Sequence, residues 1–377
     1  MARWCSVSIG FRVRMEAVTP SLLHLRELGI GAGLCSVGAT SAEPFPEVRA
    51  ELERRQTEGL HGGMQFTFRN PARSTDIRQT LPTASSLIVG AYDYQREVPE
   101  RPTGTITGRV AAYSWEDYYQ LLRNGLEPIA AALREAGHRA IVVADQNNLV
   151  DRAAAHRAGL GWWGKSSNLL LPEVGSLVVL GAVVTDAVIE PDHEQPVGDG
   201  CGSCTQCLSG CPTGAIIEPG VIDARRCLAW LVQAEGMFPK QFRRSLGDRL
   251  YGCDECQDVC PPNRIRQRRP AATGADQAWI DVLELLAADD AALLARLGRW
   301  YIPNRDPDYL RRNALLVLGN AAEPTAQVVA TVERYLQHPN SMLRAHAVWV
   351  AKELGIELPE TLNEDPSPEV RNELVEA

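Results

Sequence analysis

The chain has 377 residues, 45% of them hydrophobic, which is enough for the cores of two or three globular domains. No charged segment followed by an apolar segment opens it, and the apolar run 177–184 is far too short to cross a bilayer, so we expect a cytoplasmic protein without a signal peptide or membrane span. The net charge of −9 argues against a protein that binds nucleic acid over its whole surface.

The first 195 residues predict an α/β domain, because helical and strand-like segments alternate. Helices are expected over 21–28, where apolar residues recur at helical spacing up to Gly29, and over the charged stretch 47–58. Two more are expected from the aromatic cluster 112–119 to about residue 136 and over 149–159. Core strands are expected at the apolar, β-branched runs 86–92, 138–144 and 176–185.

Asp145 directly follows the predicted strand 138–144. An acid at the end of a buried strand lies where ligands bind in open α/β sheets. The alternative is an N-cap or turn residue, and the sequence leaves both interpretations open. The later stretch 159–165, Gly-Leu-Gly-Trp-Trp-Gly-Lys, lacks the spacing of a phosphate-binding loop and suits a backbone that lies against a large flat cofactor.

Eight of the ten cysteines lie between residues 201 and 260. The first four follow the spacing C-x2-C-x2-C-x3-C-P, which holds one bacterial-type [4Fe–4S] cluster with three cysteines and gives the fourth to a second cluster. This interleaving predicts a first quartet of Cys201, Cys204, Cys207 and Cys260, and a second quartet of Cys211, Cys227, Cys253 and Cys256. Two structural zinc sites are the alternative. A disulfide framework is disfavoured because it requires a short secreted chain.

Basic residues gather beside these cysteines. Residues 201–270 carry ten basic and seven acidic groups, a local net charge of +3. Such a patch suits phosphate contacts. The alternative is an ordinary solvated helix face.

After an expected linker at 270–277, the chain is helical with a weak repeat. Arg311-Arg-Asn-Ala314 recurs as Arg344-Ala-His-Ala347, and Arg371 begins a truncated third unit. A period near 30 residues predicts HEAT-like helical repeats, and so few repeats should dock on the main body. We therefore expect an α+β multidomain protein with an α/β domain over 1–195, a ferredoxin-type 2[4Fe–4S] domain over 196–270 and a helical-repeat domain over 271–377.

Together these motifs resemble the epoxyqueuosine reductase family, whose members are cobalamin-dependent enzymes of the last step of queuosine synthesis in tRNA. The resemblance is carried by Asp145 with Asp151-Arg152, the stretch 159–165, Leu171-Pro172 with Gly175-Ser176, the ferredoxin runs with 251–261, and Arg311–Ala314. It implies a cobalamin-binding domain similar to that of reductive dehalogenases and two clusters that pass electrons to cobalt. The implied reaction reduces epoxyqueuosine to queuosine at the wobble position of tRNA. We expect a monomer that takes its electrons from an external donor.

The resemblance also assigns residues. Asp145 matches the family's proton donor, and opening an epoxide leaves an alkoxide that a carboxylic acid with a raised pKa can protonate. Positions near the corrin are matched by Asp145, Arg73, Arg152, Leu169, Leu180 and Leu228, where the leucines would act largely through their backbone. Positions that meet tRNA are matched by Glu235, Gly236, Phe238, Pro239 and Arg244, and Arg243 is expected to join Arg244 in phosphate contacts.

The sequence departs from the family pattern at the expected substrate pocket. Ala112 replaces a basic residue, one position is missing after Trp115, Tyr119 stands where histidine is expected, and Gln-Asn-Asn follows Asp145. Two alternatives therefore stay open. One is a cobalamin and iron–sulfur reductase of another substrate, similar to a reductive dehalogenase. The other is a 2[4Fe–4S] electron carrier, which would leave the first 195 residues unexplained.

Overall fold

The computed structural model describes residues 18–191, 197–265 and 277–375. The expected linker at 270–277 lies outside the described residues except for Gln277, and so do Arg266, Arg268 and Arg269 of the basic region.

A four-stranded sheet forms the centre of the N-terminal part. Its order is β1 (Ser36–Ser41), β2 (Ser86–Asp93), β7 (Val178–Thr185) and β4 (Ala140–Ala144), and every neighbouring pair is antiparallel. The three expected strands are present. The short strand β1 was missed because its sequence, Ser-Val-Gly-Ala-Thr-Ser, has little of the apolar, β-branched character that indicated the others.

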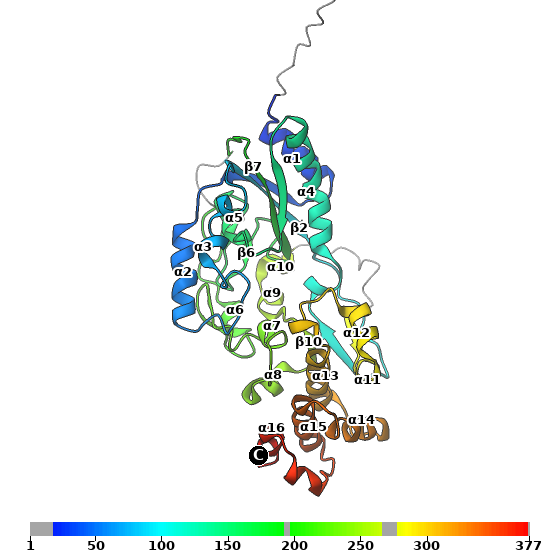
Figure 1. The fold of residues 1–377 in the computed structure, drawn as a ribbon. Coiled ribbons are helices and arrows are strands. Elements are labelled where there is room, and N and C mark those ends of the chain that lie inside the picture. The colour runs from blue at the N-terminus through cyan, green and yellow to red at the C-terminus, as the bar shows by residue number, and fades with distance from the viewer. Residues whose placement is uncertain (1–17, 192–196, 266–276, 376–377) are drawn as a thin grey trace, which may run out of the picture.

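Helices cover both faces of this sheet (Figure 1). Helices α1 (Leu22–Gly31) and α4 (Tyr118–Glu135) pack on one face, and α5 (Asp151–Arg157) packs on the other. In β2, Leu87 and Val89 point to the α5 side and Ile88 points to the α4 side, and all three are fully buried. Burial on both faces explains why these strands read as continuous apolar runs rather than alternating ones.

The predicted end of α1 at Gly29 is wrong, because α1 continues to Gly31. Gly29 is instead a packing position: a Cβ there would lie 2.8 Å from Val37 and 2.9 Å from Ile129. Peripheral helices α2 (Pro46–Thr57) and α3 (Pro71–Ser74) lie beside the α5 side of the sheet (Figure 1).

The cysteine-rich part is built from short elements. They are α6 (Gln206–Ser209), β8 (Ile216–Glu218), β9 (Val221–Ile222), α7 (Leu228–Leu231), α8 (Arg243–Leu246), α9 (Glu255–Asp258) and α10 (Pro261–Ile265). A short antiparallel pair, β5 (Trp162–Trp163) and β6 (Leu169–Leu170), precedes them in the chain. Single-turn 3-10 helices occur at Ile77–Gln79, Ala112–Ser114, Lys240–Phe242, Pro303–Arg305 and Glu360–Glu364.

A second sheet joins the three expected domains. Its central strand β3 (Thr107–Val110) pairs in parallel with β10 (Arg249–Tyr251) and antiparallel with β11 (Trp279–Asp281). One strand thus comes from each expected domain, and the core beneath the sheet continues into the C-terminal helices. The boundaries 1–195, 196–270 and 271–377 stay a prediction, with this sheet as the joint between the units.

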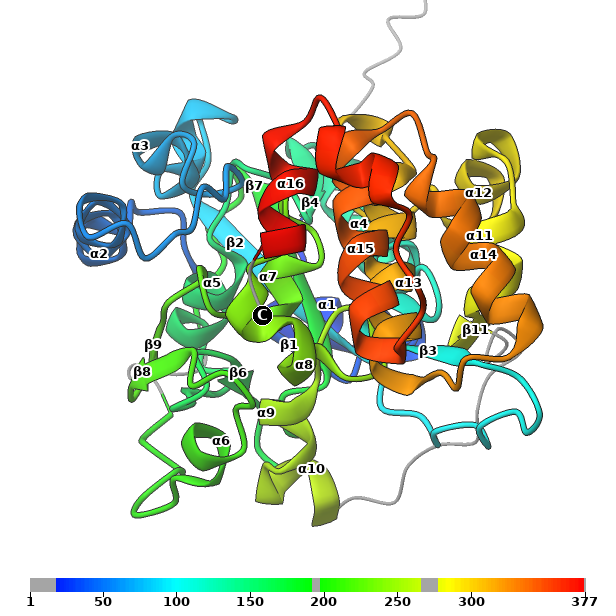
Figure 2. The same cartoon turned by 90° about the horizontal axis from the view of Figure 1, so that it is seen from below.

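The C-terminal part is helical, as expected. It contains α11 (Val282–Ala287), α12 (Asp290–Leu297), α13 (Asp308–Ala321), α14 (Ala326–Leu336), α15 (Ser341–Leu354) and α16 (Pro368–Val375). Helix α15 packs against α13, α14 and α16 (Figure 2). The two repeat motifs lie at corresponding positions in α13 and α15, and the HEAT-like classification stays a prediction.

The expected docking of these helices on the main body is present. Arg312 of α13 is fully buried and its guanidinium donates to four backbone carbonyls of the cysteine-rich part, those of Leu231, Val232, Ala234 and Gly236. None of the helices in the described part of the chain is both long and apolar enough to cross a bilayer.

Candidate functional site

Asp145 lies at the end of β4 and has a φ of 55°, in the left-handed region that aspartate tolerates better than most residues. The turn after it is tied to α3, because the Ser74 hydroxyl donates to the carbonyl of Asn147 at 2.8 Å. Helix α5 begins six residues later with Val150 as its N-cap residue and without a side-chain capping bond. The interpretation of Asp145 as an N-cap is therefore wrong, and the residue lies in a turn.

The ionisable side chains of Arg123, Asp151 and Tyr119 lie around Asp145. Asp145 is exposed to solvent as a residue, but its carboxyl is partly buried by the surrounding chain, and this burial raises its pKa. The positive charge of Arg123 acts in the opposite direction and lowers the pKa. Burial, together with the charge of Asp145, raises the pKa of Asp151 well above its ordinary value. Burial also raises the pKa of Tyr119, and both aspartates raise it further. The tyrosine that replaces the expected histidine therefore lies within this group.

Two buried oxygens near Asp145 lack a partner among the described residues, namely Oδ1 of Asp151 and Oδ1 of Asn148. Beside them, Arg152 donates to the carbonyl of Ser167 at 2.6 Å and stays partly open to solvent. Unpaired buried acceptors suggest a missing ligand. The amide groups around a corrin ring are donors of the required kind, so these residues fit cobalamin.

The other predicted corrin residues differ in their surroundings. Arg73 is exposed on α3, next to the Ser74 that holds the Asp145 turn. Leu169 and Leu180 belong to the core beneath α5, with 2% and 7% of their surface exposed, so only their backbone is available to a cofactor. Leu228 starts α7 and packs in a separate cluster with Phe238.

The electrostatic effects among the cysteines agree with the two predicted quartets, and the assignment of ligands stays a prediction. Burial raises the pKa of Cys260 to about 11, and the charges that raise it further are those of Cys201, Cys207 and Cys204. Cys260 is thus close to the first quartet despite the intervening sequence.

The second quartet shows the same relation. Burial raises the pKa of Cys256 well above its ordinary value, with further contributions from Cys253, Cys227 and Cys211. Burial also tends to raise the pKa of Cys211, but hydrogen bonds lower it overall, among them an N–H of Ala215 that lies 3.2 Å from its sulfur.

The quartets suit clusters better than single ions. None of the eight motif cysteines forms a disulfide bond. Four thiolates around one zinc ion lie about 3.8 Å apart, given Zn–S bonds of about 2.3 Å. Within the described ranges, no three cysteine, histidine or acidic side chains converge closely enough to hold one metal ion. An iron–sulfur cube holds its thiolates farther apart than a single ion does.

A buried amide network fixes the cluster part against the sheet. Asn263 accepts the N–H of Ser176 at 2.8 Å and donates to the Ser176 hydroxyl, while its own carbonyl accepts from Gln95. Gln257, between two cluster cysteines, donates to the Ser176 carbonyl at 2.9 Å. Gly175 is required here, because its φ is 89° and a Cβ would lie 2.0 Å from the Asn263 side chain. Sequence reasoning missed this network because its members are up to 168 residues apart.

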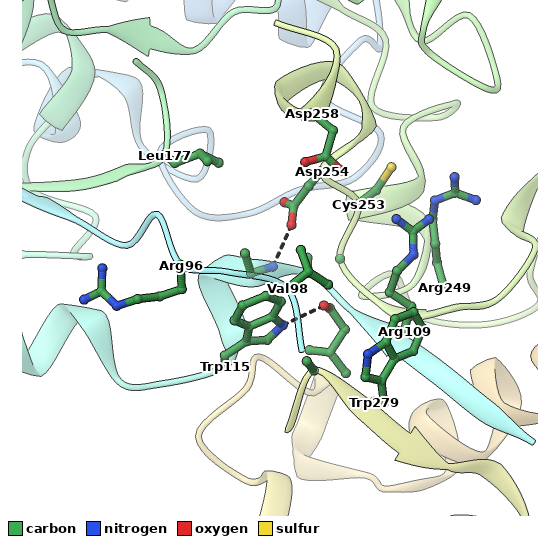
Figure 3. Close-up of a pocket in the computed structure, with 15 residues that line it drawn as sticks. Arg96, Val98, Arg109, Trp115, Leu177, Arg249, Cys253, Asp254, Asp258 and Trp279 are labelled. Atoms are coloured by element: carbon green, nitrogen blue, oxygen red, sulfur yellow. Dashed lines mark hydrogen bonds between the residues drawn. The ribbon is translucent and has the colours of Figure 1, made fainter. Parts of the chain in front are cut away.

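A cavity of about 60 Å³ lies beside Cys253 (Figure 3). Arg96, Trp115 and Asp254 line it, and Asp254 accepts the N–H of Ala112 at 2.6 Å. This space is too small for a corrin, and neither Asp145 nor Asp151 lines it. The cavity belongs to the junction around the second quartet and is separate from the Asp145 site.

The predicted tRNA residues fall into two groups. Glu235, Gly236 and Arg244 are exposed and Pro239 is half-buried. Phe238 is only 1% exposed, and its N–H donates to Nε2 of buried His346.

The prediction of a phosphate contact for Arg243 is wrong. This side chain is 1% exposed and forms a two-point ion pair with Glu373 of α16, with distances of 3.0 and 2.7 Å. Arg244 has 80% of its side chain exposed and forms a surface ion pair with Glu353 at 2.7 Å, so it is the solvent-accessible cation of the two arginines.

Two family models match the chain. The model described as 4Fe-4S double cluster binding domain matches residues 200–263, and the model described as Epoxyqueuosine reductase QueG, DUF1730 matches residues 74–146. Among curated proteins, epoxyqueuosine reductase of Bacillus cereus is 33% identical over 332 residues, 86% of each chain. The enzyme of Bacillus subtilis is 32% identical over 341 residues, 88% of this chain and 87% of that one. The chain belongs to the epoxyqueuosine reductase family.

Solved structures of this family have the same fold. An epoxyqueuosine reductase bound to an epoxyqueuosine-modified tRNA stem loop aligns with a TM-score of 0.85 at 30% identity, over 93% of this chain and 96% of that chain. The Bacillus subtilis enzyme, with the loop of its catalytic aspartate swung out of the active site, aligns with a TM-score of 0.81 at 29% identity over the same shares. Membership confirms the expected oxidoreductase class and the mixed fold of helices and sheets, and the matching cluster domain confirms the two [4Fe–4S] clusters.

Proposed function

We propose that this chain reduces epoxyqueuosine to queuosine in tRNA, with Asp145 as the proton donor. The observation that carries the proposal is the position of Asp145, a carboxyl with a raised pKa in a turn at the edge of the sheet. The chain also belongs to a family whose curated members are named epoxyqueuosine reductase. A raised pKa keeps a carboxylic acid protonated for donation nearer neutral pH.

The residues have separate roles in this proposal. Replacing the epoxide by a double bond consumes two electrons and two protons and releases water, and bound cobalamin and the two clusters supply the electrons. Asp145 gives its proton to the oxygen freed when the epoxide C–O bond breaks. Asp151 holds a second proton nearby, because burial and the charge of Asp145 raise its pKa well above the ordinary value. Arg152 and the backbone near Leu169 and Leu180 hold the cofactor.

The decisive experiment uses anaerobically reconstituted protein, loaded with cobalamin and reduced chemically, and a stem loop that carries epoxyqueuosine. Loss of one oxygen atom from the modified nucleoside, measured by mass spectrometry, is the expected result. An unchanged nucleoside with fully loaded protein would reject the proposal and favour a reductase of another substrate. Protein that holds both clusters but leaves the cobalamin spectrum unchanged would favour an electron carrier.

The ligand assignment has its own test. Replacing Cys260 should damage the cluster of the first quartet, because Cys260 lies beside Cys201, Cys204 and Cys207. We expect Cys260→Ala to lose about half of the roughly eight irons that two [4Fe–4S] clusters contain. Cys35→Ala is the matched control, since that thiol donates to the carbonyl of Ala91 far from both quartets, and it should keep all the iron. Full iron content in Cys260→Ala would refute the assignment.

We further propose that the enzyme acts in the cytoplasm as a monomer and takes electrons from an external donor. Thiolate-held clusters favour a reducing compartment. Size-exclusion chromatography of the loaded protein, with and without the stem loop, tests the monomer.

A further inference from the structure

The loop between α12 and α13 lies beside the candidate active site. The Tyr251 hydroxyl donates to the carbonyl of Tyr301 at 3.1 Å, and the Tyr251 ring stacks on Trp300 with 4.3 Å between centroids. Burial raises the pKa of Tyr251, and the charge of Asp145 raises it further. The loop therefore contacts a residue on which the charge of the proposed proton donor acts.

Two further sets of contacts hold this loop. Arg299 donates to the carbonyl of Trp115 at 2.9 Å and the Trp300 indole donates to the carbonyl of Ser114 at 3.1 Å, just before the helix that carries Tyr119. On the other side, the Asn304 side chain donates to Oε1 of Glu235 at 3.2 Å. The loop therefore bridges the Asp145 group and the segment predicted to meet tRNA.

The same loop carries a large aromatic ring in solvent. Trp300 and Ile302 are each 5% exposed, whereas Tyr301 between them is 55% exposed. Asn304 and Arg305 follow with φ values of 52° and 57°, two successive left-handed residues that are not glycine. Such strained backbone persists only where surrounding contacts enforce it, and it clusters at functional sites. A lone exposed aromatic residue is ordinary, but this ring is carried by a firmly anchored loop that contacts both Tyr251 and Glu235.

We propose that Tyr301 is a stacking platform for one unpaired nucleobase of the tRNA stem loop, adjacent to the nucleotide whose base enters the Asp145 site. The inference rests on the proposed function. When one base leaves the stack of an RNA loop, the bases on either side of it lose a stacking partner. Proteins that recognise single-stranded RNA supply exposed aromatic side chains on which such bases stack. Arg305 on the same loop is exposed, and its positive charge suits a flanking phosphate.

The first test measures the Kd of the stem loop under anaerobic conditions. Tyr301→Ala should raise Kd roughly 5- to 150-fold, the range for loss of one base–aromatic stack. Tyr301→Phe and Tyr301→Trp keep a ring and should bind within a few-fold of the original chain. The control is Leu23→Ala, which removes a side chain of similar exposure, 63%, from α1 near the far end of the molecule (Figure 1). Equal Kd values for Tyr301→Ala and the original chain, or a Phe variant as weak as the Ala variant, would overturn the platform.

A spectroscopic test reports stacking directly. A stem loop with 2-aminopurine on one side of the modified position should lose fluorescence on binding the original chain and retain it on binding Tyr301→Ala. Two stem loops, with the probe 5′ or 3′ of that position, identify the stacked base. The inference would be rejected if both stem loops lost as much 2-aminopurine fluorescence on binding Tyr301→Ala as on binding the original chain.

Kinetics separate this inference from the proposed function. Stacking holds substrate and transition state alike, so Tyr301→Ala should raise KM and leave kcat within a few-fold. If the original chain fails to convert the stem loop, the proposed function fails while the binding comparison still decides the platform. If conversion proceeds and Tyr301→Ala keeps its KM, the platform fails and the function stands.

Discussion

Two regions of this molecule bury charged side chains and satisfy them to different degrees. Where α16 docks, Arg243 and Glu373 are 1% and 4% exposed and form a two-point ion pair. At the end of β4, Asp151 has a buried oxygen without a partner among the described residues, and burial raises the pKa of both Asp151 and Asp145. Fully bonded charges build an interface, whereas incompletely bonded ones mark candidate sites of proton chemistry and ligand binding.

The largest expected effect comes from Asp145→Asn. Asparagine tolerates the left-handed φ of 55° and cannot supply a carboxylic proton, so folding should persist and turnover should fall roughly 10²- to 10⁴-fold. Anaerobic single-turnover assays measure this, with cluster and cobalamin absorbance as checks on loading. Asp289→Asn is the matched control, since Asp289 caps α12 and asparagine caps as well, and it should change turnover only a few-fold. Near-normal turnover of an Asp145→Asn protein that holds its clusters and cobalamin would show that Asp145 is not the proton donor. The Asp145 site would then no longer differ from the docking interface in carrying proton chemistry.

Breaking the docked ion pair should affect stability rather than chemistry. Glu373→Gln leaves the buried Arg243 guanidinium without a countercharge. The free energy needed to detach α16 from the main body should therefore fall by about 3–5 kcal/mol. Hydrogen exchange of the amides in α16 and in 238–243 measures that opening. Glu53→Gln removes an exposed partner of Arg49 and should cost less than about 1 kcal/mol. Unchanged protection in Glu373→Gln would show that this pair does not hold the interface.

The pH dependence of turnover sharpens the view of the Asp145 site. The donor is the protonated carboxyl, so kcat/KM should fall as pH rises through the raised pKa of Asp145. Arg123→Gln removes a positive charge that lowers this pKa, so the fall should begin at higher pH. An alkaline limb at the same pH in Arg123→Gln and in the original chain would mean that the limb reports another group.

The smallest expected effect separates Arg244 from its buried neighbour. Arg244→Ala should weaken stem-loop binding and lower the salt slope by roughly 0.7–0.9, the value of one phosphate contact. Arg49→Ala on α2 removes a similarly exposed, ion-paired arginine and should leave the slope unchanged. Equal slopes for Arg244→Ala and the original chain would place Arg244 on a solvated face.

The candidate site could be predicted only in part. Asp145 was found because it directly follows an apolar run, which is a local signal. The strand directions around it were not predicted, and neither was the unpaired oxygen of Asp151. The roles of Tyr251 and Tyr301 depend on a loop more than 100 residues from Asp145, and no local pattern brings them together.

The sequence by itself determined the cluster part and the apolar strands, because their physics is local. Three predicted ligands of the first cluster lie three residues apart in the chain, so their spacing indicates the site, and a strand buried on both faces must be continuously apolar. Tertiary structure decided which charges serve function. Arg243 and Arg244 are adjacent in the chain, but Glu373, 130 residues after Arg243, pairs with one and leaves the other open to solvent. Burial sets the cost of a charge, and burial is fixed only when distant segments pack.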